Sequence, residues 1–236
     1  FLYYHYLLWD YVKKQDKRNL LSLEEPRFGT PLLVRWRGHV FTQDLLNSVI
    51  ETYSILEALG ATRTKPKIIL EVGGGYGRNM YVLKHLFPNI KIIMIDIPPA
   101  IVLAQWYMSR VFPDGKILPI GDYKRFSDIK RKYEEADFVF LLPHQIELLP
   151  RKSIELFVNI NSFQEMTFEQ IKAYFDQIDR LTKAVFYTKQ WKKQDNPRAD
   201  IQIGEYEYPV HKSWKELFHR EAQIQSKFFE AAYQIK

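Results

Sequence analysis

Cysteine is absent from the 236 residues of the chain. Disulfide bonds and thiolate metal sites are therefore excluded, and a reducing compartment suits the sequence. No apolar run approaches the roughly 18 residues that a membrane-spanning helix needs, so we expect no membrane span. The first residues also lack the basic start and small-residue cleavage site of a secretory signal peptide. These absences favour a globular protein, and we expect it to be cytoplasmic.

A strong excess of one charge is also lacking. The chain has 34 Lys and Arg against 28 Asp and Glu, a formal net charge of +6. The basic residues alternate with acidic ones, as where Lys130, Arg131 and Lys132 precede Glu134 and Glu135. This arrangement is typical of a solvated helix face, so we expect no nucleic-acid partner. The positive balance would suit an anionic small substrate such as a nucleotide-linked sugar. No cluster of carboxylates suggests a magnesium site, and we predict no metal.

Hydrophobic patterning predicts an α/β fold. Residues 1–60 have helical spacing, with Thr42 as an N-cap and Gly60 as the end of a helix. Beyond residue 67, short continuous apolar runs suit strands buried on both faces of a parallel sheet. The expected strands are 68–72, 92–95, 138–142, 156–160 and 184–187, and the expected helices are 79–86, 100–111, 168–181 and one from about 214. Their alternation predicts a Rossmann-like, doubly wound and mainly parallel sheet.

The predicted fold divides the chain into an N-terminal extension and a catalytic domain, and the domain contains an insertion. Residues 1–62 form a helical N-terminal extension or lid, and residues 63–236 form the catalytic domain. Residues 112–136 fit the alternation poorly, so we interpret them as an insertion with a short strand at 117–120. The sequence leaves open whether the chain forms a homo-oligomer.

The most informative segment is the glycine loop that follows the first expected strand. It reads Glu71-Val72-Gly73-Gly74-Gly75-Tyr76-Gly77-Arg78-Asn79. A P-loop is excluded because Gly-Lys-Ser/Thr is missing. A dinucleotide loop would place Arg78 where close helix–strand packing needs Gly or Ala. The spacing that fits is an acidic residue followed by three alternating glycines.

A second acidic residue supports a nucleoside ligand. Asp96 ends the next expected strand, 19 residues after Gly77. A carboxylate at this place can accept hydrogen bonds from both hydroxyls of a ribose. The alternative reading is an Asp that only caps the next helix, and NAD stays open as a less favoured cofactor.

Together these motifs resemble those of class I S-adenosylmethionine-dependent methyltransferases. Further segments are similar to a family of sugar O-methyltransferases, over about residues 28–214: Ile95–Pro99, Phe140–Gln145 and Asn161–Met166. The resemblance implies the class I methyltransferase fold and S-adenosylmethionine as cofactor. It also implies methylation of a sugar hydroxyl on a nucleotide sugar or a glycan, as in polysaccharide biosynthesis.

The resemblance also implies roles for particular residues. The loop and its surroundings would bind the cofactor through Glu71, Gly73, Gly74, Gly75, Tyr76, Gly77, Asn79, Asp96, Ile97 and Asn161. His144 and Gln145 would contact adenine if residues 138–142 are the third core strand. Asp122 would do so if the shorter strand 117–120 is the third strand instead.

The base that removes the hydroxyl proton has three candidates, Glu165, His144 and His211. Each of the three could instead have no catalytic role and serve only as a helix cap, a stacking residue or a surface residue. The expected substrate contacts are Ser162, Gln164, Tyr206 and Trp214. A non-sugar acceptor, an NAD-binding oxidoreductase and a non-catalytic cofactor-binding protein stay open, whereas methylation of nucleic-acid bases is disfavoured.

Overall fold

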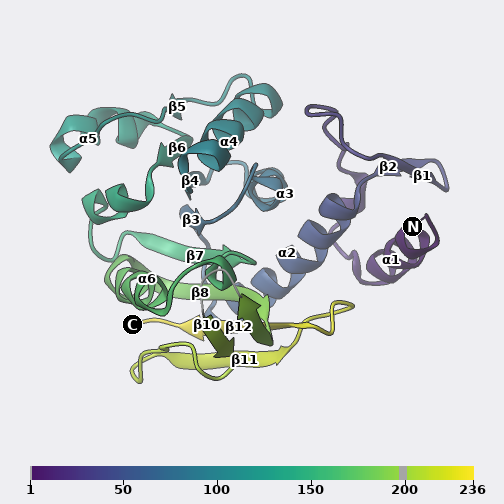
Figure 1. The fold of residues 1–236 in the computed structure, drawn as a ribbon. Helices are drawn as coiled ribbons and strands as arrows, with labels where there is room; N and C mark the ends of the chain where they lie inside the picture. Colours follow the sequence, from purple (N-terminus) through teal and green to yellow (C-terminus); the bar gives the residue numbers. More distant parts are fainter. Residues whose placement is uncertain (1, 197–200) are drawn as a thin grey trace.

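The computed structural model describes residues 2–196 and 201–236. Its centre is an eight-stranded sheet in the order β11-β12-β8-β7-β3-β4-β6-β5 (Figure 1). The strands from β8 to β5 run parallel, and β12 and β11 form an antiparallel edge. The strands are β3 (Ile68–Val72), β4 (Lys91–Ile95), β5 (Ile117–Leu118), β6 (Phe138–Leu141), β7 (Ile154–Ile160), β8 (Thr182–Trp191), β11 (Lys215–Glu221) and β12 (Phe228–Gln234). The predicted mainly parallel sheet is confirmed.

Helices cover both faces of this sheet. They are α1 (Leu2–Gln15), α2 (Gln43–Thr62), α3 (Arg78–Leu86), α4 (Pro98–Val111), α5 (Phe126–Glu135) and α6 (Phe168–Leu181), with shorter 3₁₀ turns at η1 (Leu20–Ser22), η2 (Pro143–Leu148) and η3 (Phe163–Glu165). Successive strand residues point to opposite faces, so Ile69 joins the core under α1–α4 and Leu70 the core under α5 and α6. Burial on both faces explains why β3, β4, β6 and β7 are almost entirely apolar.

The N-terminal extension contains more than helices. As predicted, Thr42 caps α2, and its Oγ1 accepts a hydrogen bond from the Leu45 amide at 3.0 Å. The predicted stop at Gly60 is wrong, because α2 continues to Thr62 and Arg63 takes the left-handed conformation instead. The hairpin of β1 (Val34–Trp36) and β2 (His39–Phe41) was not predicted.

The C-terminal segment corrects a second prediction. The expected helix from about residue 214 is absent from the described part of the chain, where β11 and β12 extend the sheet beyond β8. Alternate residues of β12 explain the strand, since Phe229, Ala231 and Tyr233 share one core and Ala232 lies in the other. A further hairpin, β9 (Lys193–Asn196) with β10 (Ile201–Gly204), precedes this edge.

The order of the central strands decides which segment is the third core strand. β6 pairs directly with β4, and β5 pairs only with β6, at the edge of the sheet. Residues 138–141 therefore form the third core strand, counting β3 as the first and β4 as the second. Residues 112–136 add an edge strand and α5. Over residues 2–196 and 201–236, no helix is both long and apolar enough to cross a membrane.

Candidate functional site

The glycine loop lies at the carboxyl ends of β3, β4 and β7, where parallel sheets bind ligands. Gly73 has a φ of +72°, and its N–H donates to the Ile95 carbonyl at 2.9 Å. A Cβ at Gly73 would lie 2.1 Å from Ser162 Oγ, so only glycine fits there. Ser162 is buried and accepts a hydrogen bond from Asn159 Nδ2 at 2.7 Å. Its Oγ also donates to the carbonyl of Val72, just before the loop, at 3.4 Å, so Ser162 holds the segment after β7 against the start of the loop.

Asp96 closes the other side of the loop. Its Oδ2 accepts a hydrogen bond from the Gly75 amide at 3.0 Å, and its Oδ1 accepts one from the Ile97 amide at 2.8 Å. Burial raises the pKa of Asp96, although the two amide bonds oppose that rise. Each oxygen keeps a second lone pair, so the carboxylate can still accept hydrogen bonds from a ligand.

Glu71 lies beneath the loop and is 1% exposed. Its Oε1 accepts a long hydrogen bond, 3.4 Å, from Asn79 Nδ2, whereas its Oε2 has no hydrogen-bond partner among the described residues. Burial raises the pKa of Glu71 to about 7. A buried acceptor without a donor is costly. The loop therefore fits a ligand that brings a donor or a positive charge, such as the amino group of a methionine moiety.

A second corner of the site lies at the end of β6. Gln145 is buried there, and its Nε2 donates to the carbonyls of Gly121, at 2.8 Å, and Tyr123, at 3.3 Å. These bonds bring the segment with Asp122 beside the end of β6, where His144 is exposed. The two alternative adenine contacts thus lie at the same corner. Gln145 uses its amide within the protein.

The segment after β7 provides the third side. Asn161 takes a left-handed conformation, with φ of 58°, and its Oδ1 accepts a hydrogen bond from Gln164 Nε2 at 2.5 Å. Gln164 Oε1 in turn accepts the Trp191 amide of β8 at 3.3 Å. Glu165 follows in η3 with an exposed side chain. Residues 161–165 lie over the carboxyl ends of β7 and β8. Glu165 comes three residues after Ser162, which contacts the glycine loop.

Three predicted residues lie elsewhere. Trp214 Nε1 donates to Asp179 in the last turn of α6 at 2.8 Å, and the His211 ring stacks on Trp214 with ring centres 5.0 Å apart. Lys152 Nζ, just before β7 begins, donates to the Asp179 carbonyl, which places this group near the amino ends of the strands. Tyr206 is 81% exposed in the turn after β10. The structure does not bring His211, Trp214 or Tyr206 to the glycine loop.

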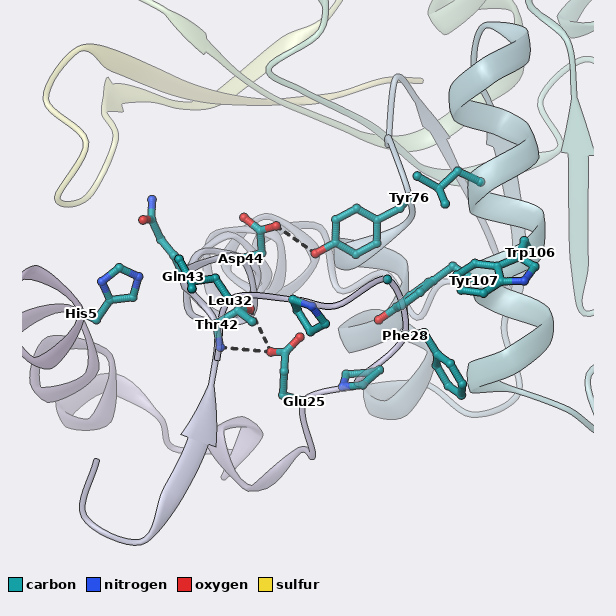
Figure 2. Close-up of a pocket in the computed structure, with 14 residues that line it drawn as sticks. His5, Glu25, Phe28, Leu32, Thr42, Gln43, Asp44, Tyr76, Trp106 and Tyr107 are labelled. Carbon is teal, nitrogen blue, oxygen red and sulfur yellow. Dashed lines mark hydrogen bonds between the residues drawn. The ribbon is translucent and has the colours of Figure 1, made fainter. Parts of the chain in front are cut away.

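A cavity that sequence reasoning missed adjoins the loop on the side of the N-terminal extension (Figure 2). It measures about 310 Å³, and Tyr76 of the loop forms part of its wall. Its main aromatic and acidic lining residues are Glu25, Phe28, Asp44, Trp106 and Tyr107. Only the break at Pro26, Gly29 and Pro31 hinted at an irregular covering segment. Within residues 2–196 and 201–236, no group of three or more His, Asp or Glu is arranged to hold a metal ion.

Comparisons with known proteins agree with this geometry. No family model matches the chain. A curated relative, myricetin 3'-O-methyltransferase 4 of Solanum lycopersicum, is 25% identical over 144 residues, which are 60% of this chain and 35% of the relative. The chain thus matches about a third of that protein's length.

Solved structures extend the likeness to almost the whole chain. Magnesium protoporphyrin IX methyltransferase (ChlM) from Synechocystis PCC 6803 superposes with a TM-score of 0.54 in its S-adenosylhomocysteine-bound form and 0.53 in its S-adenosylmethionine-bound form. Both are 11% identical and cover 95% of this chain, and the matches span 95% and 91% of the solved chains. The chain therefore has the Rossmann-like fold of class I S-adenosylmethionine-dependent methyltransferases.

Proposed function

We propose that this chain is an S-adenosylmethionine-dependent methyltransferase that methylates a hydroxyl group of a sugar-bearing acceptor. The observation that carries the proposal is the buried Glu71 carboxyl, which has an oxygen without a donor beneath a glycine loop. The similar structures of ChlM hold S-adenosylmethionine or its product, and the tomato relative is an O-methyltransferase by name. The resemblance of residues 161–166 to sugar O-methyltransferases supports the sugar.

Different residues around the loop would bind different parts of the cofactor. Glu71 and Gly73–Gly77 would hold its methionine part, and Asp96 would accept hydrogen bonds from its ribose hydroxyls. His144 or Asp122 would lie beside the adenine, at the corner that Gln145 holds together. When bound, S-adenosylmethionine supplies a methyl group on a positively charged sulfur, which a hydroxyl oxygen can attack.

Glu165 is the proposed general base. Its exposed carboxyl follows the segment that Ser162 anchors to the glycine loop, so it can face an acceptor at the carboxyl ends of the strands. His144 is the second candidate. Asn161 and Gln164 would orient the sugar through their amide groups. Methylation of a non-sugar hydroxyl is the second candidate function, since the tomato relative is named a myricetin 3'-O-methyltransferase.

One experiment separates cofactor binding from chemistry. Calorimetric titration with S-adenosylhomocysteine gives the affinity, and mass spectrometry follows methyl transfer to a panel of glycosides. We expect Asp96→Ala to weaken S-adenosylhomocysteine binding about tenfold or more, because two charge-assisted hydrogen bonds are lost. Glu165→Gln is expected to slow transfer by about 100-fold while the affinity stays within about threefold.

Matched controls come from the same chain. Two substitutions should leave both measurements unchanged. Asp114→Ala lies beyond α4 at the opposite end of the sheet, and Glu169→Gln is exposed in the first turn of α6. Absence of any heat with S-adenosylhomocysteine would refute the cofactor assignment, and unchanged affinity in Asp96→Ala would remove Asp96 from the cofactor site. A normal transfer rate in Glu165→Gln would remove Glu165 as the base.

A further inference from the structure

The cavity beside the glycine loop has the size and lining of a small-molecule site. Its volume of about 310 Å³ is at the lower end of the range for ligand pockets, roughly 300–1,000 Å³. Phe28 and Leu103 line it although they are 44% and 48% exposed, and Trp106 is 40% exposed. Large apolar side chains are usually covered, so this open aromatic wall indicates a surface for a flat or ring-shaped ligand.

Tyr76 joins this cavity to the proposed cofactor loop. Its backbone lies between Gly75 and Gly77, while its ring forms part of the cavity wall and packs edge-on against Tyr107 of α4, with ring centres 5.1 Å apart (Figure 2). A molecule in the cavity therefore contacts the outer side of the loop that would hold the methyl donor.

Two carboxylates set the charge of the cavity. Glu25 Oε2 accepts hydrogen bonds from Thr42 Oγ1 at 2.9 Å and the Thr42 amide at 3.2 Å, and Asp44 Oδ2 accepts one from Tyr76 Oη at 2.9 Å. Among the described residues, none donates a hydrogen bond to Glu25 Oε1 or Asp44 Oδ1, so both oxygens can accept one from a ligand. Burial raises the pKa of Glu25, and the nearby Asp44 adds to the rise.

The lining of this space carries little positive charge. Among the described lining residues none is Lys or Arg, and His5 is the one basic side chain. A phosphate or carboxylate on the ligand would therefore meet two like charges without a partner, which disfavours binding. The net charge of +6 for the whole chain gives no hint of this local acidity.

We infer that this cavity binds a ring of the methyl acceptor, and that the acceptor carries hydroxyl or amine donors and no acidic group on this ring. As an acceptor site, the assignment rests on the proposed function. It narrows the substrate class, because a neutral or amino-bearing glycoside fits the cavity and a nucleotide-linked sugar does not. Glu25 and Asp44 would accept hydrogen bonds from the ligand, and Trp106 would pack against its ring.

The test uses two probes that differ in a single acidic group. Calorimetry compares 4-methylumbelliferyl β-D-glucoside with the matching β-D-glucuronide on the full chain. The wild type should bind the glucoside at least about tenfold more tightly than the glucuronide. Glu25→Gln keeps an oxygen that can accept from Thr42, so α2 stays capped, and the preference should shrink to less than about threefold.

Controls and contrary outcomes follow from the same titrations. Glu24→Gln removes a charge from the neighbouring exposed residue, outside the cavity lining, and should leave the tenfold preference intact. Trp106→Ala should weaken both probes, by about fivefold or more. The inference is overturned if neither probe binds, if the wild type binds both equally, or if Glu25→Gln and Glu24→Gln behave alike.

S-adenosylhomocysteine titrated into the same preparation distinguishes the two proposals. Binding of S-adenosylhomocysteine without binding of the glucoside would overturn the cavity inference alone. Binding of the glucoside without binding of S-adenosylhomocysteine would overturn the proposed function and leave the cavity as a site for neutral glycosides.

Discussion

Glu71 shows how the burial of one side chain makes the stability of the fold depend on pH. Burial raises its pKa from 4.5 to about 7, so the folded protein keeps the proton that the unfolded chain releases above about pH 4.5. A raised pKa gives stability that is fully present below the unfolded value and is lost as pH rises through the folded value. The free energy of unfolding should therefore fall between about pH 4.5 and 7 and then level off.

The substitution Glu71→Gln isolates this effect, because the amide does not titrate. Between pH 5 and pH 8 we expect the wild type to lose about 2–3 kcal/mol of unfolding free energy relative to the variant. Urea unfolding at both pH values measures the difference, and other titrating groups cancel in the comparison. Glu169→Gln, which is exposed, should show no such change. A pH-independent difference for Glu71→Gln would show that Glu71 is ionised in the folded state.

How well a sequence predicts a binding site depends on how close together the site residues lie along the chain. The glycine loop, Glu71 and Asp96 were found because two consecutive strand ends carry them and spacing along the chain reveals them. Glu25 and Trp106 are 81 positions apart and share a cavity only because the extension packs over α4. Nothing in their local sequence marks that contact, so the cavity had to come from the structure.

Among the elements, α2 is held to the sheet by a buried ionic cluster. Glu51 of α2 lies 2.8 Å from Arg78 Nη1, at the start of α3, and 2.9 Å from Lys189 Nζ in β8. Burial opposes the ionisation of Glu51, but attraction to the two cations outweighs it and lowers the pKa to about 2. The carboxylate therefore stays charged throughout the range in which the protein would work, and its contribution is lost progressively as pH falls from about 4.5 to about 2.

Removing this carboxylate should leave two cations buried without a counter-charge. We expect Glu51→Gln to lower the free energy of unfolding by about 3–5 kcal/mol at pH 7, as measured in urea. Glu57→Gln on the same helix is the matched control. It breaks a half-exposed pair with Arg220 and should cost about 1 kcal/mol or less. Equal losses in the two variants would contradict a special role for the buried cluster.

The elements also differ in how well their sequences specify them. Strands β3, β4, β6 and β7 are buried on both faces, so their continuous apolar runs predicted them directly. β11 is an edge strand that is only partly buried, and its mixed sequence fits a helix as well as a strand. Pairing with β12 decides between the two, and this contact spans a turn that the local pattern does not reveal.

For the molecule as a whole, the net charge and the local charge of the cavity predict ligands of different charge. A net charge of +6 suits an anionic substrate, whereas the cavity beside the loop presents two carboxylates and no Lys or Arg. Ligand selection follows the field inside a cavity, where charges lie within a few ångströms of the ligand and screening is weak. The overall charge therefore says more about solubility and encounter than about the acceptor.

The extension and the sheet share one core, so α2 should open only when the whole molecule unfolds. Eleven residues of α2 are buried, and side chains such as Leu46 and Ile55 belong to the same cluster as Ile69 and Ile92. In native-state hydrogen exchange, α2 amides should therefore open at the same free energy as those of β3 and β4. α1 buries only four residues and should open at lower free energy. Early exchange of α2 together with α1 would show instead that residues 1–62 act as a separate lid.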